Sequence, residues 1–249
     1  MDREKKYTPV NKGHFFNLET AERVNNFKKK ISFKWEKEYK EYRTLWEELP
    51  LKRIVRDYPL LVDLETVSRC NLKCPMCPTV TQEFEDKRIT PFKRGQINVR
   101  LAKKIIDEVA GKIYSLRLSW IGEPTLHSSL IEIAKYAKSK KIKEISFLTN
   151  GYKLKMDYFK KLVDAGVDLI TVSIDGMDEI YNKIRYPLKF NETVKKLEDI
   201  ANFKRKNNLD KPLIKIQGVW PAVKENPEKF YNIFKPITDL IAFNALIDY

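Results

Sequence analysis

Apolar residues recur along this chain with two different periods. Short runs with a period of two alternate with longer stretches whose apolar positions repeat every three or four residues. The first pattern predicts β-strands over 60–67, 114–120, 144–150, 168–175, 213–220 and 239–246. The second predicts helices over 99–110, 129–139, 155–165, 192–206 and 227–234. Strands that alternate with helices indicate an α/β fold with a parallel sheet and right-handed crossovers.

The predicted strands are apolar on one face and polar on the other. In the fourth strand the apolar residues Ile170, Val172 and Ile174 alternate with Thr171, Ser173 and Asp175. A doubly wound sheet is apolar on both faces, so the alternation favours a barrel with helices outside and a polar interior. Six strands are too few to close an eight-stranded barrel. We therefore expect a partial (β/α)6 TIM-like barrel that is laterally open, with its active site at the carboxyl ends of the strands.

The polar face of the strands carries four charged residues. By alternation, the side chains of Asp63, Glu65, Arg117 and Lys215 point into the barrel. Charged groups in such a place either bind substrate and transfer protons or neutralise one another in an internal ion-pair network. The sequence leaves both alternatives open.

Residues 1–58 form a charged helical extension that differs from the barrel core over 59–249. An apolar stripe from Val24 to Leu49 predicts one long amphipathic helix, which Asn17 or Thr20 caps and Pro50 ends. Such a helix packs on the outside of the main domain or, alternatively, serves as a lid or docking arm for a macromolecular substrate. The core reaches its sixth predicted strand where the chain stops.

Composition narrows the class of protein. The formal net charge is +14, which favours acidic partners without identifying one. The three cysteines fall within eight positions, so they do not form a disulfide framework. The amino terminus resembles no secretory signal, and no apolar run reaches the roughly twenty residues that span a bilayer. We expect a cytoplasmic protein with reduced thiols and no membrane association.

All three cysteines lie on the loop that follows the first predicted strand. Cys70, Cys74 and Cys77 have the spacing C-x3-C-x2-C, which lets three thiolates converge on one metal centre. A four-iron cluster that only carries electrons takes four cysteines, so three leave one iron open to a small molecule. The competing hypothesis is structural zinc, which needs a fourth ligand that only His14 or His127 can supply.

This loop resembles the cluster-binding loop of the radical S-adenosylmethionine superfamily. The resemblance covers about 60–246 and is closest in motif style to the branch of sulfatase and peptide maturases, the SPASM-associated enzymes. It implies a partial (β/α)6 barrel and a 4Fe-4S cluster on Cys70, Cys74 and Cys77, whose unique iron chelates S-adenosylmethionine. It further implies reductive cleavage to methionine and a 5′-deoxyadenosyl radical, which abstracts hydrogen from a substrate.

The resemblance also assigns residues to S-adenosylmethionine. The Ile121-Gly122-Glu123-Pro124 segment resembles the family's Gly-Gly-Glu-Pro motif, with Ile121 replacing a glycine and Glu123 receiving the methionine ammonium. Further residues match family positions for the nucleoside, the ribose hydroxyls, the methionine carboxylate and the adenine: Asn150, Ser173, Asp175, Arg185, Gln217, Val219 and Met76. Each side chain has an ordinary structural interpretation when taken alone, in a turn for Asn150 and at the surface for Arg185.

The expected function is therefore that of a radical S-adenosylmethionine enzyme acting on a peptide, a sugar or another small polar substrate. A reductant such as flavodoxin or ferredoxin is the expected partner. Alternatives are an enzyme that modifies tRNA or rRNA and a non-catalytic iron-sulfur or zinc scaffold. No cysteine follows Cys77, so the enzyme either uses one cluster or has an extension with auxiliary clusters outside this sequence.

Overall fold

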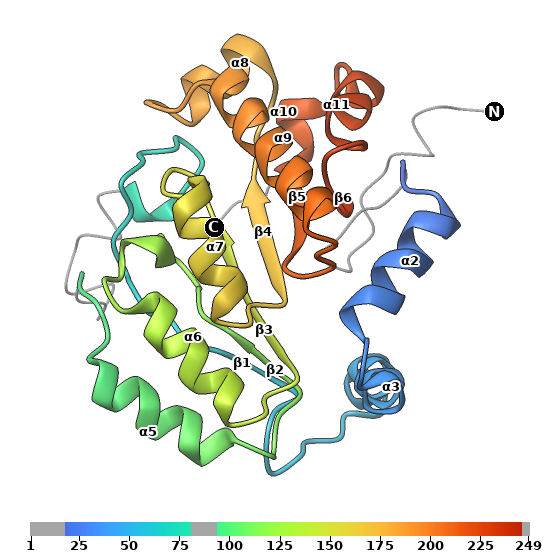
Figure 1. Ribbon diagram of the computed structural model, residues 1–249, viewed down its shortest axis with the longest axis vertical. Helices are drawn as coiled ribbons and strands as arrows, with labels where there is room; N and C mark the ends of the chain where they lie inside the picture. Colours follow the sequence, from blue (N-terminus) through green and yellow to red (C-terminus); the bar gives the residue numbers. More distant parts are fainter. Residues whose placement is uncertain (1–17, 81–93, 246–249) are drawn as a thin grey trace.

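Six parallel strands form a single sheet in a computed structural model that describes residues 18–80 and 94–245 (Figure 1). Their order in the sheet is their order in the chain: β1 Leu61–Asp63, β2 Ser115–Arg117, β3 Glu144–Thr149, β4 Leu169–Ser173, β5 Leu213–Val219 and β6 Leu240–Asn244. Within the described residues β1 and β6 do not pair with each other, so the barrel is laterally open. The predicted partial barrel is confirmed, although β1 and β2 are shorter than the sequence indicates.

Helices connect the strands. The five predicted connecting helices are present as α5 Val99–Val109, α6 Leu130–Ser139, α7 Met156–Asp164, α9 Phe190–Lys206 and α11 Pro227–Phe234. The periodicity missed four short elements: α8 Asp178–Ile184, α10 Trp220–Val223 and the 3-10 turns η1 Pro78–Val80 and η2 Pro124–Leu126. Segments this short contain too few turns to show a helical repeat. In the described ranges no helix is both long and apolar enough to cross a bilayer.

The apolar face of the sheet packs under the helices and forms the core. Phe147, Ile170, Val172, Ile214 and Ile216 are at most 1% exposed, and burial of each such side chain contributes about 1.5–3 kcal/mol. Figure 1 shows α5, α6, α7 and α9 along this outer side of the sheet. The alternation therefore assigned the helix-facing side correctly, and the polar face is the interior of the barrel.

The amino-terminal extension contains two helices rather than the predicted one. α2 spans Ala21–Ile31 and α3 spans Glu36–Lys52, with a turn between them in which Lys34 has a φ of 71°. The apolar stripe continues through this turn because Trp35 is buried there and donates its indole N–H to the carbonyl of Ile31 at 2.8 Å. A hydrophobic period therefore did not reveal the break.

The predicted helix ends are partly confirmed. Thr20 caps α2, since its hydroxyl accepts the Arg23 N–H at 3.2 Å, whereas Asn17 lies outside the described residues. Pro50 does not end the second helix, because α3 continues to Lys52 and stops where Arg53 adopts a left-handed conformation. A proline in the last turn removes one N–H but leaves the following residues free to stay helical.

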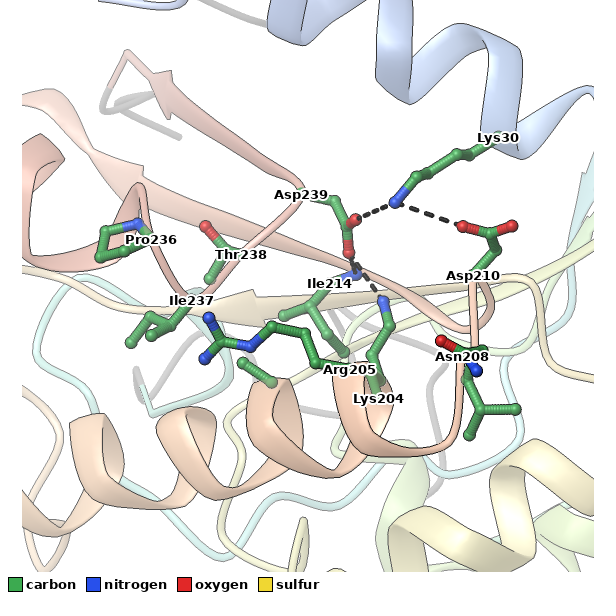
Figure 2. A pocket seen from close by; sticks show the side chains of 12 residues that line it. Lys30, Lys204, Arg205, Asn208, Asp210, Ile214, Pro236, Ile237, Thr238 and Asp239 are labelled. Carbon is green, nitrogen blue, oxygen red and sulfur yellow. Dashed lines mark hydrogen bonds and ion pairs between the residues drawn. The ribbon is translucent and has the colours of Figure 1, made fainter.

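Both extension helices pack at the amino-terminal ends of the strands. In α2, Lys30 lies 3.3 Å from Asp210, three residues before β5, and 3.7 Å from Asp239, which directly precedes β6 (Figure 2). Lys204 of α9 donates to the same Asp239 at 2.9 Å, and these residues line a cavity of about 460 Å³. In α3, the Tyr42 ring stacks on Tyr114, just before β2, with centroids 5.2 Å apart. The described part of the extension, residues 18–58, therefore packs at the end opposite the cysteine loop, which favours the packing alternative, and a role as a lid or docking arm stays a prediction.

Candidate active site at the carboxyl ends of the strands

The cysteine loop follows β1 and is held by backbone and side-chain contacts to sulfur. All three cysteines are free thiols; Cys74 is buried, and Cys70 and Cys77 are half-buried. The Leu72 N–H approaches the Cys70 sulfur at 3.4 Å, and the Thr79 hydroxyl lies 3.0 Å from the Cys77 sulfur. A turn closes the loop, since the Cys77 N–H donates to the Cys74 carbonyl at 2.9 Å.

The surroundings of the cysteine side chains shift the pKa of two of the three thiols. Burial raises the pKa of Cys70 and of Cys74, while the Leu72 N–H opposes the rise at Cys70 and the Arg185 guanidinium opposes it at Cys74. Thiolate is the form that ligates metal, so metal binding to this loop releases protons. Donors beside sulfur and a nearby guanidinium stabilise a centre that carries negative charge.

The donor set fits a cluster better than a single ion. Among the described residues, no three His, Cys, Asp or Glu side chains converge on one metal-ion position. In a 4Fe-4S cluster each cysteine ligates a different iron, so the sulfurs do not need to meet at one point. Of the two histidines that could supply zinc with a fourth ligand, His127 is buried, and both of its ring nitrogens are already hydrogen-bonded. One contacts the Ile97 carbonyl at 2.9 Å and the other accepts the Ser129 N–H at 3.0 Å, so neither nitrogen is free to bind zinc. His14 lies outside the described residues.

Gly122 packs the loop after β2 directly against the start of the cysteine loop. A Cβ atom at Gly122 would lie 1.9 Å from the Val67 carbonyl oxygen and 2.8 Å from that of Arg69. The Glu123 N–H donates to the same Arg69 oxygen at 2.8 Å. From the barrel interior, Glu65 accepts the N–H groups of Ile121 and Gly122 at 3.1 and 3.3 Å. Close backbone approach thus explains the glycine, and Glu65 positions backbone here.

Glu123 is buried, and the protein's own donors occupy its carboxylate. One oxygen accepts the Thr125 N–H at 3.1 Å, the Thr125 hydroxyl and the Thr149 hydroxyl at 2.7 Å; the other accepts the Asn150 N–H at 2.7 Å. Burial raises the pKa of Glu123 and these donors oppose the rise. Glu123 therefore ties the β2 loop to the end of β3, and its contact with a ligand ammonium stays a prediction. Neither threonine was among the predicted site residues, although Thr149 belongs to the Thr149-Asn150-Gly151 strand end and Thr125 directly follows Pro124.

Asn150 joins the end of β3 to the cysteine loop. Its side-chain N–H2 donates to the Asn71 side chain at 2.9 Å and lies 3.7 Å from the Cys70 sulfur, while its oxygen accepts the Tyr152 N–H at 2.9 Å. Gly151 follows with a φ of 77°, the left-handed conformation that an Asn-Gly pair favours. The predicted role of Asn150 near a nucleoside remains a prediction, and the structure adds its contact with sulfur.

Asp175 and Arg185 form an ion pair beside Cys74. Two guanidinium nitrogens of Arg185 donate to one Asp175 oxygen, the Nε contact measuring 2.7 Å, and the Val219 N–H donates to the other oxygen at 2.8 Å. The side chain of Asp175 is 2% exposed and that of Arg185 is 14% exposed. The sequence predicted a ligand carboxylate as the partner of Arg185, whereas in the structure its partner is Asp175.

The remaining predicted residues lie around the same end of the barrel. Ser173 of β4 and Gln217 of β5 are neighbours in the sheet register, both half-buried, and Val219 follows two residues later on the same face. Met76, in the cysteine loop, is half-buried against the core. The structure thus gathers Met76, Ser173, Gln217 and Val219 at the carboxyl ends of the strands, and their contacts with a cofactor stay predictions.

Two of the four charged interior residues support the ion-pair alternative. Asp63 accepts the Arg117 Nε–H at 2.6 Å in a two-pronged pair between β1 and β2. Lys215 is 7% exposed. Burial and the nearby Arg117 lower its pKa to about 8, which Glu144 opposes. Arg117 is therefore neutralised by Asp63, and Glu65 holds backbone N–H groups.

This fold and this set of residues define a class: a partial barrel with three cysteines after its first strand. The family model of the radical SAM superfamily matches residues 64–214, and the chain belongs to that superfamily. Its members are enzymes that use a 4Fe-4S cluster and S-adenosylmethionine, and the predicted superfamily is confirmed.

Curated relatives are similar over part of their length. A tungsten-containing aldehyde ferredoxin oxidoreductase cofactor-modifying protein of Pyrococcus furiosus is 28% identical over 71% of this chain and 48% of its own. A probable GTP 3′,8-cyclase of Methanococcus maripaludis is 34% identical over 49% of this chain and 38% of its own. The chain thus spans less than half the length of either relative.

Solved structures share the fold. Streptococcus suis SuiB bound to S-adenosylmethionine superimposes with a TM-score of 0.63 at 13% identity, covering 92% of this chain and 52% of that one. Methylornithine synthase superimposes with a TM-score of 0.53 at 12% identity, covering 93% of this chain and 62% of that one. At these identities the likeness shows the partial barrel alone.

Proposed function

We propose that this chain holds a 4Fe-4S cluster through Cys70, Cys74 and Cys77, binds S-adenosylmethionine across the carboxyl ends of its strands, and cleaves it reductively to start hydrogen abstraction. The observation that carries the proposal is the loop of three free thiols packed against the motifs at the ends of β2, β3 and β4. When bound, the cluster supplies the electron and the open iron site for this cleavage.

The residues around the loop have separable tasks under this proposal. The three thiols hold the cluster, with Leu72, Thr79 and Asn150 placed beside two of the sulfurs. Gly122 and Glu123 fix the loop after β2 against the cysteine loop, and Glu123 is the residue that the resemblance assigns to the methionine ammonium. Arg185, oriented by its ion pair with Asp175, is the residue that we assign to the carboxylate of S-adenosylmethionine.

Ser173, Gln217 and Val219 are then the residues for the nucleoside half of S-adenosylmethionine. No hydrogen bond occupies the Ser173 hydroxyl or the Gln217 amide among the described residues, and both lie at one level of adjacent strands. Hydroxyl and amide groups suit ribose and adenine edges. Val219 and Met76 offer apolar contact with the adenine ring.

For the substrate we propose a peptide, a sugar or another small polar molecule. Two relatives are named for small-molecule chemistry, a GTP cyclase and a 7,8-dihydro-6-hydroxymethylpterin dimethyltransferase. Streptococcus suis SuiB has been solved with its precursor peptide, with a TM-score of 0.59 to this chain. These names support a small or peptide substrate over nucleic acid. A flavodoxin or ferredoxin as reductant and a cytoplasmic location complete the proposal.

Anaerobic reconstitution tests the proposal. The full chain should bind about four irons and four sulfides and, with dithionite, should convert S-adenosylmethionine to 5′-deoxyadenosine and methionine. Cys74→Ala should lose both properties while keeping the far-ultraviolet circular dichroism of the wild type. A wild-type chain that binds the cluster but leaves S-adenosylmethionine intact would support the scaffold alternative instead.

A further inference from the structure

A second cavity lies outside the barrel, between the turn that follows β3 and the helices α7 and α9. It has a volume of about 680 Å³, within the usual range for small-molecule sites. We call it the basic pocket; its defining residues are Lys153, Lys155, Lys161, Lys196, Tyr152 and Tyr158. None of the residues predicted for the cluster or for S-adenosylmethionine lines it.

The lysines of the basic pocket lack acidic partners. None of the four lies within 4.0 Å of a carboxylate among the described residues, whereas many other lysines, such as Lys103, are paired. Four lysines and two acidic residues, Asp157 and Glu192, line the cavity, so positive charge is in excess. Lys196 is partly buried and donates to the Gly151 carbonyl at 2.7 Å, and burial together with Lys155 lowers its pKa, which Glu192 opposes.

The amino terminus of α7 adds to the positive charge of the cavity. Lys155 occupies the N-cap position, and no side chain caps this nine-residue helix. Helix amino termini carry partial positive charge and favour anions, and Asp157 in the first turn offsets only part of the charge that this end shares with the four lysines.

We propose that the basic pocket binds the phosphate of a small phosphorylated ligand that carries an aromatic ring, the chemical class to which nucleotides belong. A phosphate brings a charge near −2 and several acceptor oxygens, which Lys155, Lys161 and the first turn of α7 receive. The Tyr152 ring is 46% exposed and provides a surface on which a flat ring stacks. A concave site of this volume suits a small ligand rather than the flat acidic surface of a protein.

Isothermal titration calorimetry of the full, cluster-reconstituted chain at low ionic strength tests this proposal with ADP, pyrophosphate and inorganic phosphate as ligands. ADP should bind at one site per chain, more tightly than pyrophosphate, and its affinity should fall as salt screens the charges. The double variant Lys155→Ser, Lys161→Ser should bind ADP about 100-fold more weakly, at about tenfold per charged contact. Serine is a favourable N-cap, so the first substitution preserves α7.

The matched control is Lys104→Ser, Lys135→Ser, which removes the same charge from exposed positions of α5 and α6. It should bind ADP within about twofold of the wild type, because distant surface charges are screened. If both double variants bind ADP equally weakly, the loss of affinity comes from the change in net charge alone, and the proposal is overturned. Binding of phosphate without preference for ADP would overturn the aromatic part, and binding of an acidic flavodoxin but of none of the three phosphates would overturn it entirely.

Discussion

Gly122→Ala should damage the cluster site through backbone displacement alone. The added Cβ would lie 1.9 Å from the Val67 carbonyl oxygen, 1.5 Å short of the 3.4 Å at which ordinary van der Waals contact begins. Its neighbours are backbone atoms, which cannot rotate away as a side chain can. Forcing a methyl group into such a space costs about 1–3 kcal/mol or more, equivalent to a fall in melting temperature of about 2–4 °C per kcal/mol for a chain of this size.

The displaced segment leads directly to the first cysteine. Val67 and Arg69 precede Cys70, and the Arg69 carbonyl also accepts the Glu123 N–H at 2.8 Å. Anaerobically reconstituted Gly122→Ala should therefore contain less iron per folded chain and produce less 5′-deoxyadenosine than the wild type. Iron and sulfide analysis, together with thermal unfolding, measures both effects.

Gly111→Ala is the matched control for this prediction. Gly111 has a φ of 76° with open space around it, so alanine there strains the backbone without a collision. Its cost is about 1–2 kcal/mol, and it lies between α5 and β2, at the far end of the barrel. Its iron content should equal that of the wild type. Full iron content in Gly122→Ala, or equal loss in both variants, would refute the reasoning.

Three further changes test other parts of the structure. Lys215→Met removes a buried amine whose pKa in the folded protein is lowered to about 8 from 10.5. Between these two pH values the unfolded wild type binds a proton at Lys215 that the folded wild type has lost, so the free energy of unfolding rises with pH. From about pH 7.5 to 10.5 the wild type should therefore gain about 3 kcal/mol of stability relative to the variant. Urea unfolding at the two pH values measures this, and parallel stabilities would contradict the burial of Lys215. Glu123→Gln places an N–H2 group among four donors and should cost about 1–3 kcal/mol; unchanged urea stability would show that the carboxylate is not needed there. Tyr42→Ala should cost about 3–5 kcal/mol without lowering iron content per folded chain, because Tyr42 packs at the opposite end of the barrel; loss of iron would contradict that separation.

The sheet was predictable because its two faces obey one simple rule. Ile170, Val172 and Ile174 are buried together under the helices, and their alternation with polar residues along one strand is enough to predict this. The extension was mispredicted because Trp35 keeps the apolar stripe in phase through a turn, and a backbone break at Lys34 leaves no mark in hydrophobicity. Periodicity reports which side chains are buried, not whether the backbone between them is continuous.

The sequence predicted which residues lie in the candidate site, but not which residues they contact. Cysteine spacing located the loop, but the pairing of Arg185 with Asp175 depends on the path of α8, which the sequence did not reveal. Glu123 likewise receives hydrogen bonds from Thr149, twenty-six positions away in the chain and adjacent only after β2 and β3 pair. A local sequence motif does not reveal contacts between residues that the fold brings together from distant parts of the chain.

Under the proposed function, three cysteines hold a cluster whose fourth iron is open to S-adenosylmethionine. Mössbauer spectroscopy of the chain reconstituted with 57Fe resolves individual iron sites and so tests this arrangement. Adding S-adenosylmethionine should change about one quarter of the iron signal, that of the iron without a cysteine ligand. A spectrum that stays unchanged, or one in which all the irons change alike, would contradict the proposed arrangement.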